Sequence, residues 1–121
     1  MLFGNFLASL ARGRDSRRKQ DMRAVVQALE LYYNDIGRYP DDLPAAGDPF
    51  THPDNADSIY LKETPADPKT AIRYCYETAD GSSYRLAGNL ENTQDPDLSI
   101  TPVSCGGTDY NYGASSSNVN L

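Results

Sequence analysis

The stretch MRAVVQALELYYNDIGRYP, residues 22–40, decides the fold of this 121-residue chain. Its apolar side chains recur at steps of three and four residues, at Met22, Val25, Val26, Leu29, Tyr33 and Ile36. This spacing places them along one face of an α-helix and predicts that the face is buried. Gly37 is suited to the left-handed cap that ends a helix, and Pro40 prevents the helix from resuming.

The helix is predicted to extend upstream, because no proline interrupts residues 1–39. Extended backwards, the apolar stripe reaches three charged or small residues, Arg18, Asp15 and Ala11. A separate apolar patch comes earlier, formed by Phe3, Phe6, Leu7 and Leu10. We therefore predict a projecting basic helical arm, residues 1–21, and a globular head, residues 22–121, within a single domain.

After the helix the residue pattern changes. Residues 41–68 are rich in proline and turn-forming residues, which predicts an ordered connecting loop with a short helical turn near residues 57–62. Apolar and polar side chains then alternate in residues 72–78 and 83–91. With the Asp-Gly-Ser turn at 80–82 between them, these two segments predict a β-hairpin.

The last third of the chain is less regular. Residues 98–103 are a weaker strand candidate, and the tail at 106–121 is poor in core-forming residues. Hydrophobic residues make up 39% of the chain, which is enough for a small core. The predicted fold is α+β, a long N-terminal helix packed on a small antiparallel sheet of three or four strands.

The net charge of −6 is distributed unevenly. Residues 1–23 carry six cations and two anions, whereas the other 98 residues carry five cations and fifteen anions. A basic arm followed by an acidic body is suited to head-to-tail contacts between copies, or to an anionic partner at the arm. The longest mostly apolar stretch, residues 2–11, is shorter than the roughly 20 residues of a membrane span. The chain as given is therefore expected to be soluble.

Two cysteines, Cys75 and Cys105, are thirty positions apart. The chain has no C-x-x-C pair and a single histidine, His52, which argues against a metal cluster. We predict a structural disulfide, which implies an exported protein. The alternative is two unpaired thiols in the cytosol.

Several motifs, in the same order along the chain, resemble those of the type IV pilins and the type II secretion pseudopilins. They are the apolar start and basic run at residues 5–19, the helix exit LELYYNDIGRYP at 29–40, Tyr60-Leu61, Pro65-Ala66-Asp67-Pro68 and Tyr74-Cys75-Tyr76. The Gly-x-Tyr-Pro exit and the Pro-x-Asp-Pro motif are the most specific of these. The resemblance covers about residues 5–92.

The resemblance implies a structural protein without enzymatic activity, a subunit of a type IV pilus or pseudopilus filament. Such a subunit is anchored in the inner membrane as a precursor and then enters a periplasmic or cell-surface filament. Its partners are copies of itself and the inner-membrane assembly machinery. The filament contacts are expected from Phe3, Phe6, Leu7, Leu10, Arg14, Arg17, Arg18 and Lys19. The alternative is a binding module, a minor pilin for DNA uptake or for surface ligands.

The chain departs from the family pattern in two places. The family's hydrophobic first segment, with its processing site, is absent, so the chain is expected to be the soluble part of such a subunit. Lys69-Thr70 follow Pro68 where the major secretion pseudopilins commonly have tryptophan and glycine, and the calcium loop of that branch is not reproduced.

The charged motifs have ordinary interpretations beside functional ones. The basic run at residues 12–23 could bind DNA phosphates. However, Asp15 and Asp21 lie four residues from Lys19 and Arg17, and no aromatic residue is interleaved for base stacking, so we do not expect nucleic acid as a partner. Calcium could bind Asp95, Asp97 and Asp109. Without a twelve-residue calcium loop, turn aspartates are the preferred interpretation, and no cofactor is expected.

The nine tyrosines could form an adhesive surface, but tyrosine also fills half-buried sheets. We predict core positions for Tyr33, Tyr74, Tyr76 and Tyr84, and leave Tyr110 and Tyr112 open. The segment Ser-Cys-Gly-Gly at 104–107 resembles a nucleophile loop only superficially. Because the one histidine lies on a remote proline-rich loop, no catalytic residue is expected.

Overall fold

A computed structural model of the chain describes residues 2–116, and residue 1 and residues 117–121 of the predicted arm and tail lie outside the described residues. One helix is followed by seven short strands: α1 (Leu2–Ile36), β1 (Phe50–His52), β2 (Asn55–Leu61), β3 (Cys75–Glu77), β4 (Arg85–Gly88), β5 (Val103–Cys105), β6 (Thr108–Tyr110) and β7 (Tyr112–Ser115). The strands form three antiparallel sheets, β1–β2, β3–β4–β7 and β5–β6. The predicted α+β fold is confirmed.

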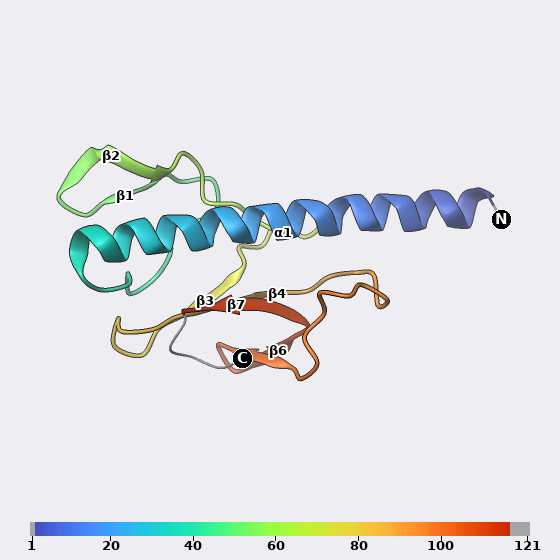
Figure 1. Ribbon diagram of the computed structural model, residues 1–121. Coiled ribbons are helices and arrows are strands. Elements are labelled where there is room, and N and C mark those ends of the chain that lie inside the picture. Colours follow the sequence, from blue (N-terminus) through green and yellow to red (C-terminus); the bar gives the residue numbers. More distant parts are fainter. Residues whose placement is uncertain (1, 117–121) are drawn as a thin grey trace.

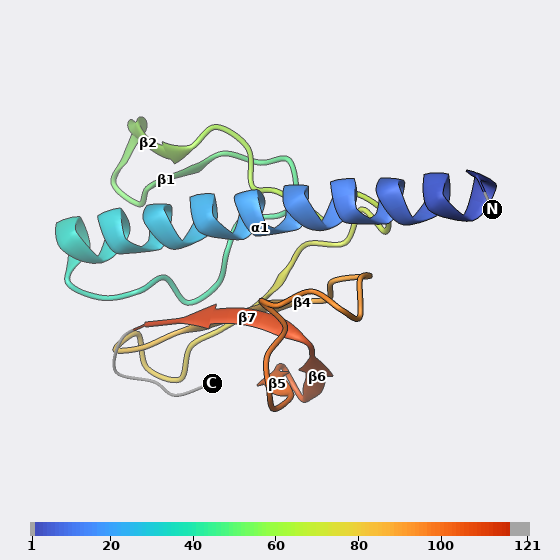
Figure 2. The same ribbon diagram turned by 45° about the vertical axis from the view of Figure 1, so that its right-hand side comes forward.

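Helix α1 lies between two layers of strands. The β1–β2 hairpin covers one side of its C-terminal half, and the β3–β4–β7 sheet covers the other (Figures 1 and 2). The N-terminal end of the helix extends beyond both layers (Figure 1). Since the helix is one continuous rod, the head fixes the direction in which this free end points.

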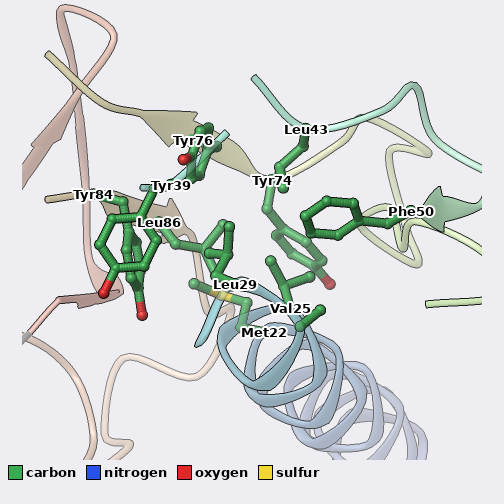
Figure 3. Close-up of a cluster of buried hydrophobic side chains, with 11 residues drawn as sticks. Met22, Val25, Leu29, Tyr39, Leu43, Phe50, Tyr74, Tyr76, Tyr84 and Leu86 are labelled. Carbon is green, nitrogen blue, oxygen red and sulfur yellow. The ribbon is translucent and has the colours of Figure 1, made fainter. Parts of the chain in front are cut away.

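The main core forms where α1 lies on the β3–β4–β7 sheet (Figure 3). Met22, Val25 and Leu29 are each at most 2% exposed, which confirms this part of the predicted stripe. They pack in one cluster with Leu86 and Tyr84 of the sheet region. The spacing of apolar residues therefore predicted the buried helix face correctly where the face meets the sheet.

At the end of the helix the prediction is wrong for one residue. Tyr33 is 40% exposed rather than part of the core. Tyr39, three residues after the helix, takes the buried place instead, and its ring lies 4.8 Å from the ring of Tyr84. Tyr33 packs on Tyr39 at 4.6 Å between ring centroids, as an outer layer. The chain can turn back in this way because Gly37 adopts a φ of 87°.

Strands β3 and β4 lie inside the two segments that the alternation predicted, and Tyr76 pairs with Leu86 in their register. Tyr74, Tyr76 and Tyr84 are buried as predicted. Ile72 is an exception, because β3 begins only at Cys75 and Ile72 is 69% exposed.

Three strand pairs, β1–β2, β5–β6 and β4–β7, were not expected, and the strand candidate at residues 98–103 overlaps β5 only at Val103. The predicted helical turn near residues 57–62 is wrong, because this segment belongs to β2. The hairpin is held on α1 by aromatic rings, with Tyr32 lying 5.6 Å from Phe50 and 5.9 Å from Tyr60 between centroids. The tail supplies β7, which pairs with β4 and completes the main sheet.

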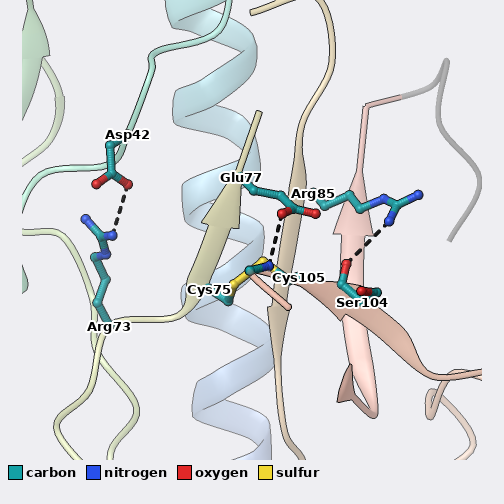
Figure 4. The surroundings of a disulfide bond; sticks show 8 residues. Asp42, Arg73, Cys75, Glu77, Arg85, Ser104 and Cys105 are labelled. Carbon is teal, nitrogen blue, oxygen red and sulfur yellow. Dashed lines mark hydrogen bonds and ion pairs between the residues drawn. A yellow bond between two sulfur atoms is a disulfide. The ribbon is translucent and has the colours of Figure 1, made fainter. Parts of the chain in front are cut away.

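The predicted disulfide between Cys75 and Cys105 is confirmed, with 6.2 Å between the two Cα atoms (Figure 4). It joins β3 to β5 and belongs to a second small cluster with Ala87 and Val103. The backbone N–H of Gly106 donates to Glu77 at 3.0 Å beside it. The disulfide therefore fastens the β5–β6 hairpin to the main sheet.

The N-terminal helix and its ionic junction as candidate functional site

The first turns of α1 carry an apolar stripe that the head leaves uncovered. Phe3, Phe6, Leu7 and Leu10 are between 44% and 68% exposed. Their steps of three and four residues place them on one side of the helix. In the part of the chain that the structure describes, no helix is long and apolar enough to cross a membrane. By their exposed fractions, the four side chains form an apolar surface on the projecting end of α1.

Charged residues, rather than apolar ones, begin the contact between α1 and the head. Asp15 is 2% exposed and Arg18 is 3% exposed. The helix therefore meets the head from Arg14 onward, about two turns before the buried apolar stripe begins at Met22. The spacing Ala11, Asp15, Arg18, Met22 continues the buried stripe, and the charges are tolerated there because they are paired.

Arg18 is the centre of this contact. Its Nε and Nη2 donate to the two carboxylate oxygens of Asp67 at 2.7 and 3.0 Å. Its Nη1 donates to Asp15 and to Glu91, both at 2.7 Å. One planar guanidinium therefore joins carboxylates from the helix, from the Pro-x-Asp-Pro motif and from the loop after β4. We call this group, Asp15, Arg18, Asp67 and Glu91, the ionic junction.

Two of the acidic partners, Asp15 on the helix and Asp67 on a loop, are themselves fixed by backbone N–H groups. Asp15 accepts hydrogen bonds from the backbone N–H groups of Glu91 and Asn92, at 2.8 and 2.9 Å. Asp67 accepts from the backbone N–H groups of Lys69 and Thr70, at 2.8 and 3.1 Å, which shapes the turn after the motif. The junction therefore ties two loops to a single stretch of the helix.

Two further cations flank the junction. Arg14 donates to both oxygens of Glu91, at 2.6 and 2.8 Å. Lys19 donates to Asp95, with a shortest distance of 2.8 Å, and to Asp97 at 2.7 Å.

The three aspartates weighed as weak calcium candidates occupy different surroundings. The ammonium group of Lys19 lies against both Asp95 and Asp97. Asp109 lies apart from them in sequence, on β6. Among the described residues, no group of three or more potential ligands could hold a metal ion. The two aspartates of the loop serve to bind the helix.

The pairing controls the ionisation of these groups. Hydrogen bonds from Arg14 and Arg18 hold the pKa of the Glu91 carboxyl well below its usual range. Arg18 likewise lowers the pKa of Asp67, and Lys19 lowers the pKa of Asp95. The same bonds raise the pKa of Arg18 and of Lys19. All of these groups therefore stay charged at neutral pH.

The structure divides the predicted filament contacts into two groups. Arg14, Arg18 and Lys19 face the head and are engaged within the chain. Arg17 remains on the surface, paired with Asp21 at 3.0 Å, beside the exposed apolar stripe. The sequence interpretation did not identify Asp67 and Glu91 as their partners. The sequence did contain one indication that Asp15 and Arg18 are buried. Helical spacing places both on the same face as the buried stripe that begins at Met22.

Comparison with known proteins places the chain in a family. A family model described as type II secretion system (T2SS), protein G, matches residues 5–97. This segment contains the arm from residue 5 onward, the helix core and the whole ionic junction. No curated protein and no solved structure matches the chain. The resemblance to pseudopilins is confirmed, and the chain belongs to the type II secretion system protein G family, whose members are structural subunits of the pseudopilus.

Proposed function

We propose that the chain assembles into the pseudopilus filament through the N-terminal part of α1. The observation that carries this proposal is the exposed stripe of Phe3, Phe6, Leu7 and Leu10 on a helix that extends past the head. Burial of apolar surface is the dominant favourable term in association. A neighbouring copy that covers the stripe therefore removes the unfavourable exposure of four large side chains.

The chemistry of the surface fits an open filament better than a closed oligomer. The stripe lies on the arm, and the rest of the surface belongs to a head of different composition and of net negative charge. A contact between two unlike patches repeats from copy to copy and gives an open filament when its rotation does not close, whereas a closed twofold dimer uses the same patch on both copies. The place of action that follows is the periplasmic side of the inner membrane, with the secretion machinery as the further partner.

The alternative of DNA binding loses support from the ion pairs. Of the six cations in residues 12–23, Arg14, Arg18 and Lys19 bind carboxylates of the head, and Arg17 binds Asp21. Strong phosphate binding needs several free cations on one surface. In the described part of the chain, Arg12 and Arg23 are the cations of this run that have no ion pair, which is too few for a nucleic-acid site.

The test is a pair of matched substitutions on the same helix. Leu10→Asp places a charge in the stripe, whereas Leu31→Asp places one on an exposed leucine at the other end of α1. We expect formaldehyde cross-linking in cells of the source organism to give a ladder of oligomers with the wild type and with Leu31→Asp. The Leu10→Asp chain should give monomer, and its thermal unfolding should match that of the wild type. A normal ladder with Leu10→Asp would contradict assembly through the arm.

A further inference from the structure

A filament of identical subunits requires that the arm and the head keep one relative placement in every copy. Each copy offers one patch on the helix and a different patch on the head, and a change in their relative placement changes the symmetry of the assembly. In this chain the buried apolar stripe of α1 begins at Met22. Between that point and the free apolar stripe, the side chains that bond to the head are charged: Arg14, Asp15, Arg18, Lys19 and Asp21.

We propose that Arg18 is a positioning residue for assembly, which fixes the register of α1 against the head by holding Asp15, Asp67 and Glu91 together. The role in assembly rests on the proposed function, whereas the role in register is a property of the chain alone. The reason lies in the geometry of the guanidinium. Its planar fork meets both oxygens of Asp67 only in one orientation, and the same group must also reach Glu91.

An apolar side chain in place of Arg18 would allow more than one register of α1 against the head. Apolar side chains tolerate a slide or rotation of the helix because the hydrophobic effect is non-directional. A shift of the helix by a few ångströms would instead separate Arg18 from partners on two loops at once. It would also withdraw Asp15 from the backbone N–H groups of Glu91 and Asn92. Misplaced registers are therefore penalised by unpaired buried charges.

The junction is complete as it stands. Within the described residues, no buried side-chain nitrogen or oxygen lacks a hydrogen-bond partner. A fully satisfied polar network is rigid, and it specifies a single arrangement more strongly than it stabilises the fold. We therefore expect loss of Arg18 to loosen the placement of the arm before it unfolds the head.

The experiment measures register and assembly separately. Nitroxide labels on Ser9→Cys and Ala79→Cys, two exposed positions on the arm and on the β3–β4 turn, report the distance between arm and head in the purified 121-residue chain. We expect a narrow distance distribution for the otherwise unchanged chain and for Arg23→Met, the matched control on the exposed side of α1. Arg18→Met should broaden the distribution, while thermal unfolding remains cooperative.

In cells, Arg18→Met should then lose the cross-linked ladder, and Arg23→Met should keep it. An unchanged distance distribution in Arg18→Met would overturn the proposal, and so would a broadened distribution with a normal ladder. Neither result would affect the proposed function, which depends on Leu10→Asp. If Arg18→Met does not fold, Asp67→Asn is used instead. This substitution weakens the two hydrogen bonds from Arg18 to residue 67 and leaves Arg18 paired with Asp15 and Glu91. An unchanged distribution in that variant would also overturn the proposal.

Discussion

Arg18 occupies a position that a hydropathy pattern assigns to an apolar residue. Removing two or more charged groups from water is unfavourable by several kcal/mol for each ion, and mutual attraction repays this only when all hydrogen-bonding positions are used. Here four donated hydrogen bonds reach three carboxylates. Two of these carboxylates, Asp15 and Asp67, also accept hydrogen bonds from backbone N–H groups. The charge at this residue is therefore tolerated because of its neighbours rather than because of its own exposure.

The junction predicts how stability depends on pH. The pKa of Glu91 is lowered in the folded chain, chiefly by Arg14 and Arg18, from an unfolded value of about 4.3. A lowered pKa contributes stability above the unfolded pKa, and this contribution is lost as the pH falls through the folded value. The wild-type urea midpoint should therefore fall on acidification from pH 7 to pH 3. Glu91→Gln should have a lower midpoint at pH 7 and a smaller fall.

The matched control is Glu63→Gln, at an exposed glutamate for which the described residues provide no ion pair. It should keep the wild-type dependence on pH. Equal slopes for Glu91→Gln and the wild type would show that Glu91 does not carry this contribution. Asp67 and Asp95, whose pKa values are also lowered, remain in both variants and account for the residual slope.

At the scale of secondary-structure elements, strand β7 depends on one glycine. A Cβ atom at Gly113 would lie 2.8 Å from the backbone oxygen of Leu86 and 3.0 Å from Val103. Gly113→Ala should therefore separate β7 from β4 and destabilise the fold by about 1–3 kcal/mol, as overpacking usually does. Urea unfolding followed by circular dichroism measures this change.

The control is the same substitution in the helix. A Cβ atom at Gly13 meets nothing within 4 Å. Gly13→Ala should stabilise α1 by about 1 kcal/mol, because alanine is the better helix former. If both alanine variants had the same free energy of unfolding, the close approach at Gly113 would not contribute to stability.

The β5–β6 hairpin depends on the disulfide. The bond closes a loop with a sequence separation of 30 residues. In the chain-entropy description, such a loop stabilises the folded state by roughly 3.5 kcal/mol. The double variant Cys75→Ser, Cys105→Ser should unfold at a lower urea concentration, and amide exchange should accelerate first in Val103–Cys105 and Thr108–Tyr110. Midpoints that do not differ between oxidised wild type and double variant would contradict this prediction.

The elements that sequence patterns predicted are those whose burial follows from apolar side chains alone. The helix face at Met22, Val25 and Leu29 and the strands around Tyr76 and Leu86 belong to this class. The β1–β2 hairpin was missed because its segment is rich in proline and aspartate, and its place depends on distant rings of α1. Strand β7 was missed because Tyr112–Ser115 has few apolar residues and pairs with a strand far away in the sequence.

The ionic junction could be predicted only in part, for a related reason. Helical spacing placed Asp15 and Arg18 on the buried stripe, but hydropathy favoured an exposed position for both. Their burial depends on Asp67 and Glu91, which are 49 and 73 residues from Arg18. No local pattern connects residues at such separations.

At the scale of the whole molecule, the ion pairs change which charges are available to other copies. Reversal of Arg18 or Lys19 would break contacts inside the chain, so it would test the fold rather than the assembly. Arg12 and Arg17 are the exposed cations of the arm among the described residues. The basic arm therefore offers fewer cations to a neighbouring copy than its number of charged residues suggests.

The last prediction concerns these two exposed cations, Arg12 and Arg17. The double reversal Arg12→Glu, Arg17→Glu should weaken the cross-linked ladder in cells, because it places negative charge on the arm, which in the filament would meet acidic heads. Each exposed pair is worth only about 0–1 kcal/mol, so the loss should be partial, whereas Leu10→Asp should abolish assembly. The purified variant should unfold within about 0.5 kcal/mol of the wild type, as is usual for surface substitutions. Reversal of Arg38 and Lys62, two exposed cations of the head, changes the net charge equally and should leave the ladder intact. Equal loss in both double variants would mean that total charge, and not its position on the arm, governs assembly.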